Sequence, residues 1–64
     1  MSRLTEKQKR FADEYLIDLN ATQAAIRAGY SPKSAEQQGS RLLSNAKVRA
    51  YIDERMAELS RRTG

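Results

Sequence analysis

Apolar residues recur at helical spacing in four stretches of this chain, and turn-forming residues separate the stretches. The first helix is expected to begin at Thr5, whose hydroxyl can form a capping box with the side chain of Gln8. Charged residues fall mostly on one side of this helix. Its apolar side is predicted to consist of Phe11, Ala12, Tyr15, Leu16 and Leu19.

A short, alanine-rich helix is predicted over residues 21–28, with Asn20 as its N-cap and Gln23 in the capping-box position. Small side chains let a neighbouring helix approach closely, so this helix is expected to be sandwiched between others. Gly29 follows directly, at the position where a left-handed residue commonly ends a helix.

The third helix is predicted to run from Pro32 to Leu43, because serine is a favoured N-cap and proline a favoured first helical residue. Its buried stripe is expected to contain Ala35, Gly39, Leu42 and Leu43. A glycine inside a helix costs ~1 kcal/mol relative to alanine, which indicates close packing at Gly39.

A fourth helix is predicted to begin near Ala46, after Ser44 and Asn45 interrupt the pattern. Val48, Tyr51, Ile52, Met56 and Leu59 form a continuous apolar stripe along it. The chain shows no strand pattern or internal repeat. We therefore expect one all-α domain over residues 1–64, a compact four-helix arrangement that contains a helix-turn-helix.

The composition narrows the chemistry of this 64-residue chain. It has no cysteine and no histidine, so it lacks disulfides, thiolate metal sites and the commonest general base. It also has no phosphate-binding glycine loop and no carboxylate constellation suited to catalysis. Glu14 and Asp18 are an i,i+4 carboxylate pair, but a solvated helix face explains them better than a metal site. We expect neither an enzyme nor a cofactor.

The formal charge is +4 and the isoelectric point about 9.9, which favours a polyanionic partner. Residues 1–10 and residues 33–50 each carry a net charge of +3. No apolar run approaches the ~20 residues of a membrane span, and the N-terminus lacks the apolar core of a signal peptide. An intracellular protein with no membrane association is expected.

The segment Gly29-Tyr30-Ser31, between a small-residue helix and a polar-faced one, is typical of a helix-turn-helix. In that motif the first helix braces the second, whose N-terminal part enters the major groove of DNA. The side chains expected to face outward from the third helix are Lys33, Ser34, Gln37, Gln38, Ser40 and Arg41.

Four of these side chains suit particular parts of a DNA duplex. Gln37 and Gln38 suit adenine edges, Arg41 suits guanine or phosphate, and Lys33 suits a phosphate near the helix N-terminus. Composition and periodicity alone leave nucleic-acid binding and a helical adaptor both open. Lys7, Lys9 and Arg10 are candidates for phosphate contacts or for solubility alone, and Tyr30 for base stacking or rim packing.

Three segments together resemble the phage terminase small-subunit family. They are LTEKQKRF at 4–11 with Tyr15, NATQAAIRAGYS at 20–31, and AEQQGSRLL at 35–43 with Asn45, Val48 and Ile52. The resemblance implies Lys33, Ser34, Gln37 and Arg41 as DNA-facing residues, with residues 20–31 as their scaffold.

The same resemblance implies recognition of a packaging-initiation region on double-stranded viral DNA, in the cytoplasm of a bacterial host. It implies delivery of that DNA to a large subunit with ATPase and nuclease activities. In this family an oligomerisation region that forms a ring follows the helix-turn-helix, and we expect that region to be absent here. A protein-interaction or oligomerisation adaptor and a prophage transcription regulator remain as alternatives.

Overall fold

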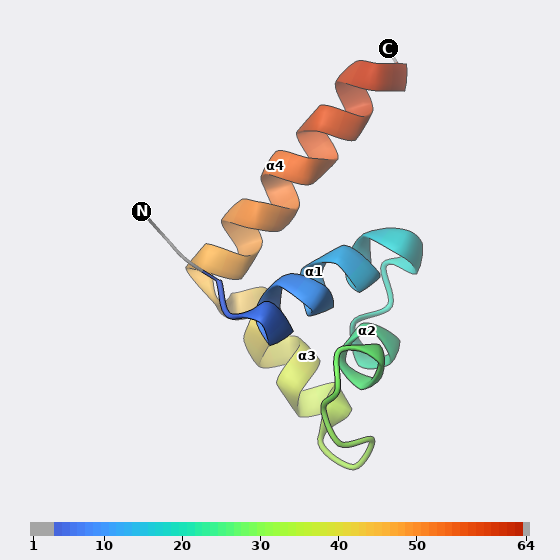
Figure 1. The fold of residues 1–64 in the computed structure, drawn as a ribbon, viewed down its shortest axis with the longest axis vertical. Coiled ribbons are helices and arrows are strands. Elements are labelled where there is room, and N and C mark those ends of the chain that lie inside the picture. The colour runs from blue at the N-terminus through green and yellow to red at the C-terminus, as the bar shows by residue number, and fades with distance from the viewer. Residues whose placement is uncertain (1–3, 64) are drawn as a thin grey trace.

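The computed structural model describes residues 4–63, and in this range the chain forms four helices and no strand. They are α1 (Glu6–Asp18), α2 (Ala21–Arg27), α3 (Ala35–Ser44) and α4 (Ala46–Thr63). Figure 1 shows α2 and α3 gathered on one side of α1, while α4 extends past α1 to the opposite end of the molecule. The all-α prediction is confirmed. Arg3, which contributes to the N-terminal charge, lies outside the described residues.

Local side-chain caps define where three of the helices begin. Thr5 and Gln8 form both hydrogen bonds of the capping box, each at 3.1 Å. Asn20 accepts a hydrogen bond from the backbone N–H of Gln23 at 3.1 Å, but its own N–H donates to Asp18 instead of the Gln23 side chain. The Asn45 side chain accepts from the backbone of Lys47 at 2.9 Å and so caps α4.

The end of α2 is closed by a left-handed glycine, as the sequence predicts. Gly29 has a φ of 104° and donates its N–H to the carbonyl of Ile26. The N–H of Tyr30 donates to the carbonyl of Ala25 at 3.0 Å. These two bonds form a Schellman motif, which satisfies the last carbonyls of α2 and reverses the chain toward α3.

The predicted start of the third helix is wrong by three residues. Helix α3 begins at Ala35 and not at Pro32, because residues 31–34 form a separate turn. In this turn the Ser34 N–H donates to the Ser31 carbonyl at 3.0 Å. Pro32 therefore takes the second position of a turn, its other favoured location, instead of the first position of a helix.

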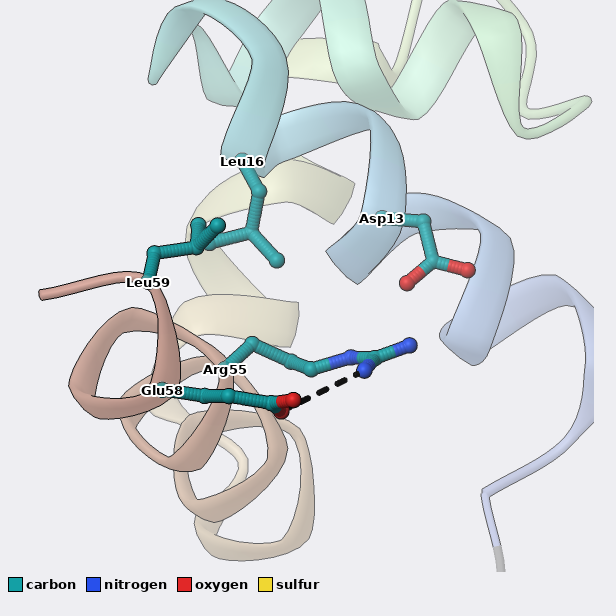
Figure 2. A pocket seen from close by; sticks show the side chains of 5 residues that line it. All are labelled: Asp13, Leu16, Arg55, Glu58 and Leu59. Carbon is teal, nitrogen blue, oxygen red and sulfur yellow. Dashed lines mark ion pairs between the residues drawn. The ribbon is translucent and has the colours of Figure 1, made fainter. Parts of the chain in front are cut away.

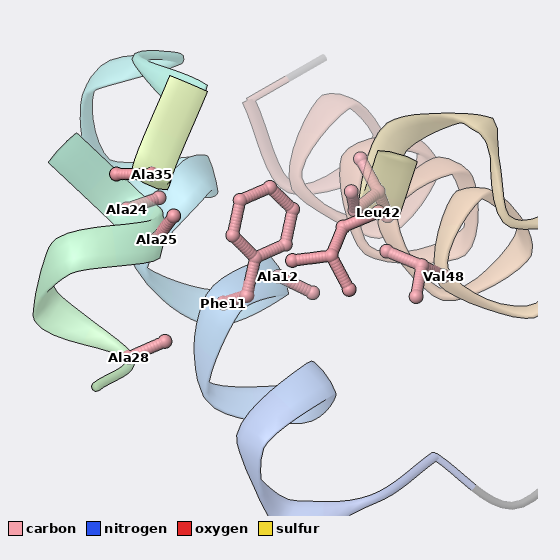
Figure 3. Packing of buried hydrophobic residues seen from close by; sticks show 9 residues of the cluster. Phe11, Ala12, Ala24, Ala25, Ala28, Ala35, Leu42 and Val48 are labelled. Atoms are coloured by element: carbon pink, nitrogen blue, oxygen red, sulfur yellow. The ribbon is translucent and has the colours of Figure 1, made fainter. Parts of the chain in front are cut away.

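The core is small and rich in alanine. Phe11 and Val48 are the largest fully buried side chains. Figure 3 shows the ring of Phe11 between a group of alanines on α2 and α3 and the pair Leu42 and Val48. The buried apolar residues are Phe11, Ala12, Ala24, Ala25, Ala28, Ala35, Leu42, Val48 and Ile52. This packing confirms that α2 is a sandwiched helix.

Two of the predicted apolar stripes are only partly buried. Leu19 lies beyond the end of α1 with a φ of 56° and is 58% exposed, so its assignment to the buried face is wrong. On α4, Val48 and Ile52 are buried, whereas Met56 and Leu59 are exposed. The outer half of α4 projects beyond the other helices (Figure 1), so the second half of its stripe is covered only in part.

Among the described residues, no helix combines the length and the apolar character needed to cross a lipid bilayer.

Candidate nucleic-acid interface

Helix α3 is held against α2 by a close backbone contact at Gly39. A β-carbon at residue 39 would lie 2.9 Å from the carbonyl oxygen of Ala21 and 3.2 Å from its methyl group. Gly39 is buried, together with Ala35 and Leu42 on the same face of α3. The small residues of this face let α2 brace α3, so the opposite face of α3 points away from the domain.

Three of the six polar residues that the sequence assigns to the outward face of α3 are exposed on the helix itself. Gln37, Ser40 and Arg41 are exposed, and Lys33 is exposed in the turn before the helix. Gln37 and Arg41 are one helical turn apart and lie on one face. The face therefore offers an amide, a hydroxyl and a guanidinium in one row, with an ammonium near its start.

Two further candidate residues lie at the margins of this row. Gln38 and Ser34 are half-buried. The Ser34 hydroxyl donates to the Ser31 carbonyl at 3.4 Å, within the turn that precedes α3. Glu36, in the first turn of α3, is exposed and places a negative charge beside the row.

Lys7 of α1 lies at the turn between α2 and α3. Its Nζ is 4.4 Å from the centroid of the Tyr30 ring, a cation–π contact. Its Cε lies 3.5 Å from the position of a β-carbon on Gly29. Sequence periodicity could not predict this contact, because Lys7 lies on α1 whereas Tyr30 follows α2.

Arg10 and Lys9 lie elsewhere on α1. They line an open surface to which α3 contributes no residue, together with Glu6, Asp13 and Glu14. The structure therefore separates the N-terminal cations, with Lys7 at the turn and Lys9 and Arg10 among carboxylates.

Glu14 and Asp18 both form ion pairs with the guanidinium of Arg27. Arg27, the last residue of α2, lies 3.1 Å from Asp18 and 3.8 Å from Glu14. No group of three potential metal ligands occurs among the residues that the structure describes. These ion pairs link the C-terminal end of α2 to α1.

A second polar network joins α1 to α4. The Tyr51 hydroxyl donates a hydrogen bond to Asp13 at 2.7 Å. Burial raises the pKa of Tyr51, and the hydrogen bond to Asp13 raises it further. Arg55 lies 5.5 Å from the Tyr51 ring centroid and 3.7 Å from Glu58, and Figure 2 shows its guanidinium extending from α4 toward Asp13.

Helix α3, braced by α2 across a glycine turn and exposing a polar face, has the layout expected of a helix-turn-helix. Comparison with known proteins then identifies its family. A sequence profile described as "Terminase small subunit" matches residues 4–64. The chain belongs to the terminase small-subunit family.

Several relatives carry the same description. The chain is 54% identical over 57 residues to the "Terminase small subunit" of Staphylococcus phage 80alpha, which covers 88% of this chain and 39% of that protein. It is 49% identical over 59 residues to the "Terminase small subunit" of Bacillus phage SF6, covering 91% of this chain and 41% of that protein. A "PBSX phage terminase small subunit" of Bacillus subtilis (strain 168) is 57% identical over 49 residues, covering 77% of this chain and 18% of that protein. The chain thus spans about two fifths of the length of its phage relatives.

Proposed function

We propose that this domain binds double-stranded viral DNA at the packaging-initiation region, as the DNA-recognition module of a phage terminase small subunit. The observation that carries the proposal is the exposed row of Gln37, Ser40 and Arg41 on α3, with Lys33 at its start. The row lies on the helix that α2 braces, in the arrangement that presents a helix to the major groove. Family membership supports the same interpretation.

The proposed role is recognition and not catalysis. The domain marks viral DNA in the cytoplasm of the bacterial host, and the large ATPase and nuclease subunit acts on the DNA afterwards. Contact with the large subunit belongs, in this proposal, to a region outside the 64 residues. A single domain with few phosphate contacts is expected to bind weakly, with a Kd on the order of 10⁻⁴–10⁻⁶ M.

Replacing Arg41 with alanine tests the proposed interface. We expect Arg41→Ala to weaken binding to a duplex oligonucleotide, because an arginine contact to a base or phosphate contributes ~1–3 kcal/mol. Binding is followed by amide chemical-shift titration at low and moderate salt, and helicity by circular dichroism. Shifts that cluster over residues 32–44 and fade with salt support the proposal.

Arg61→Ala is the matched control. Arg61 is exposed near the outer end of α4, which points away from α3 in Figure 1, and its loss removes the same charge. Equal losses of affinity for the two variants would mean that Arg41 acts only through the net charge of the domain. Unchanged affinity for Arg41→Ala would remove this residue from the site.

A second candidate function, self-association, rests on a different surface. In the part of the chain that the structure describes, the large exposed apolar side chains are Ile17, Leu19, Met56 and Leu59. All four line one open groove of about 500 Å³ between the end of α1 and the outer half of α4. Exposed apolar patches of this kind mark interaction sites.

We propose a second copy of the chain as the partner in this groove. The outer half of α4 carries apolar residues beside Arg55 and Glu58, which form an ion pair at 3.7 Å within one chain. In an antiparallel pair of α4 helices each of these charges can instead meet the opposite charge of the other copy. Sedimentation should then detect dimers that Ile17→Asp abolishes and that Ala57→Asp, exposed outside the groove lining, leaves intact. A purely monomeric wild-type chain at high concentration would eliminate this candidate.

A further inference from the structure

Lys7 and Tyr30 form a fixed unit beside the turn that leads into α3. The Tyr30 backbone N–H is bound to the Ala25 carbonyl at 3.0 Å as part of the Schellman motif, so the end of α2 fixes the Tyr30 backbone beside Lys7. The Lys7 stem crosses Gly29, and its ammonium lies over the ring at 4.4 Å. The unit therefore links the first turn of α1 to the loop before the exposed row of α3.

The ring restricts Lys7 without removing it from solvent. A lysine side chain samples many rotamers in solution, and part of this conformational entropy is lost whenever the ammonium is fixed on a ligand. Contact with the Tyr30 ring fixes the ammonium in advance, while the side chain remains exposed. Pre-organisation of this kind lowers the entropic cost of binding an anion.

We propose that Lys7, positioned by Tyr30, binds a backbone phosphate of the duplex whose groove receives α3. This inference rests on the proposed DNA-binding function. A phosphate contact carries no sequence information, but it fixes how the reading helix is aligned on the duplex. Lys7 thereby supplies from α1 a contact at the N-terminal end of α3, where Lys33 is also exposed.

Lys9 does not share this role. It is two residues from Lys7 on α1, about 200° around the helix axis. It lines the surface that contains the carboxylates of Glu6, Asp13 and Glu14, which would repel a phosphodiester. Lys9 therefore provides a matched control of the same residue type on the same helix.

The salt dependence of duplex binding separates a phosphate contact from a general charge effect. The titration uses the 64-residue chain with two fluorescently labelled duplexes of unrelated sequence. Each phosphate contact contributes about 0.9 to the slope of log K against log salt. We expect Lys7→Met to lower that slope by about 0.9 and to weaken both duplexes by about threefold to tenfold at ~0.1 M salt. Lys9→Met should leave the slope unchanged.

Substitutions of Tyr30 test the positioning role. Tyr30→Phe keeps an aromatic ring under Lys7 and should bind as the wild type does. Tyr30→Leu keeps every charge but removes the ring, so affinity should fall while the slope is retained. Thermal unfolding of each variant shows that the comparison involves folded protein.

Two results would overturn the inference, and they are distinguishable. If the wild type binds duplex but Lys7→Met and Lys9→Met share its slope, Lys7 makes no phosphate contact and the DNA-binding proposal stands. If the wild type binds neither duplex even at low salt, the DNA-binding proposal and the inference fail together.

Discussion

Gly39 of α3 lies directly against the backbone of Ala21 in α2, so that a β-carbon at residue 39 would be 2.9 Å from the Ala21 carbonyl oxygen. This distance is shorter than side-chain carbons tolerate, and the atom in the way belongs to the backbone. Glycine at this position therefore permits the helix crossing on which the candidate interface depends.

Gly39→Ala is expected to destabilise the domain even though alanine is the better helix former. The propensity gain is ~1 kcal/mol, whereas forcing two backbones apart in a packed core costs about 1–3 kcal/mol or more. Urea denaturation should show a net loss in the free energy of unfolding. Ser40→Ala, the next residue and exposed, is the control and should change stability little. A Gly39→Ala variant more stable than the wild type would contradict this account.

Leu19 offers the opposite case, a residue whose replacement by glycine should stabilise the fold. Its φ of 56° is left-handed, its N–H donates to Tyr15 at 2.7 Å, and its side chain is 58% exposed. Leu19→Gly relieves the strain of a β-carbon in this region and should raise stability by about 0.5–1 kcal/mol. Leu19→Ala keeps the β-carbon and should give no such gain; equal effects would show that strain is not the cause.

The hydrogen bond between Tyr51 and Asp13 should make the free energy of unfolding depend on pH in the alkaline range. Near neutral pH, Tyr51→Phe is expected to cost about 1 kcal/mol. Burial, then the bond to Asp13, raises the pKa of the folded phenol above the ordinary 10.0. The unfolded phenol therefore loses its proton first, so the stabilisation is complete below pH 10.0 and declines as pH rises through the raised pKa.

Urea denaturation near neutral pH and about one unit above the ordinary tyrosine pKa checks this dependence. The difference in stability between the wild type and Tyr51→Phe should shrink at the higher pH. In an Asp13→Ala background the Tyr51→Phe effect should be much smaller at neutral pH. A constant difference at both pH values would exclude the proposed linkage.

The caps of α3 and α4 should contribute unequally to stability. Asn45 accepts from the Lys47 backbone at 2.9 Å, whereas Ser34 makes no side-chain hydrogen bond to α3. Asn45→Ala should therefore cost ~1 kcal/mol, and Ser34→Ala markedly less. Thermal unfolding followed by circular dichroism compares the two variants directly. A larger loss for Ser34→Ala would mean that the turn at 31–34 matters more than the cap.

Much of the secondary structure follows from the sequence because the decisive contacts are local. Thr5 with Gln8 and Gly29 at the end of α2 act over a few residues and form the predicted bonds and backbone conformation. Asn20 caps α2 through the Gln23 N–H as predicted, but its own N–H donates to Asp18 and not to the Gln23 side chain. The terminase small-subunit resemblance, carried by three segments, is confirmed by the comparisons. The DNA-facing role of the α3 row stays a prediction.

Only the tertiary structure decided the remaining features, because they depend on which helices cross and where. The sequence at 31–34 predicts a helix start, but proline also suits the second position of a turn, and the folded chain forms the turn. The apolar stripe of α4 continues past Ile52, but the end of α1 covers Met56 and Leu59 only in part. Tyr51 meets Asp13 across 38 residues of chain, and Lys7 meets Tyr30 across the α1–α2 interface. No local periodicity encodes such pairs, since they exist only after hydrophobic packing has fixed the helix crossings.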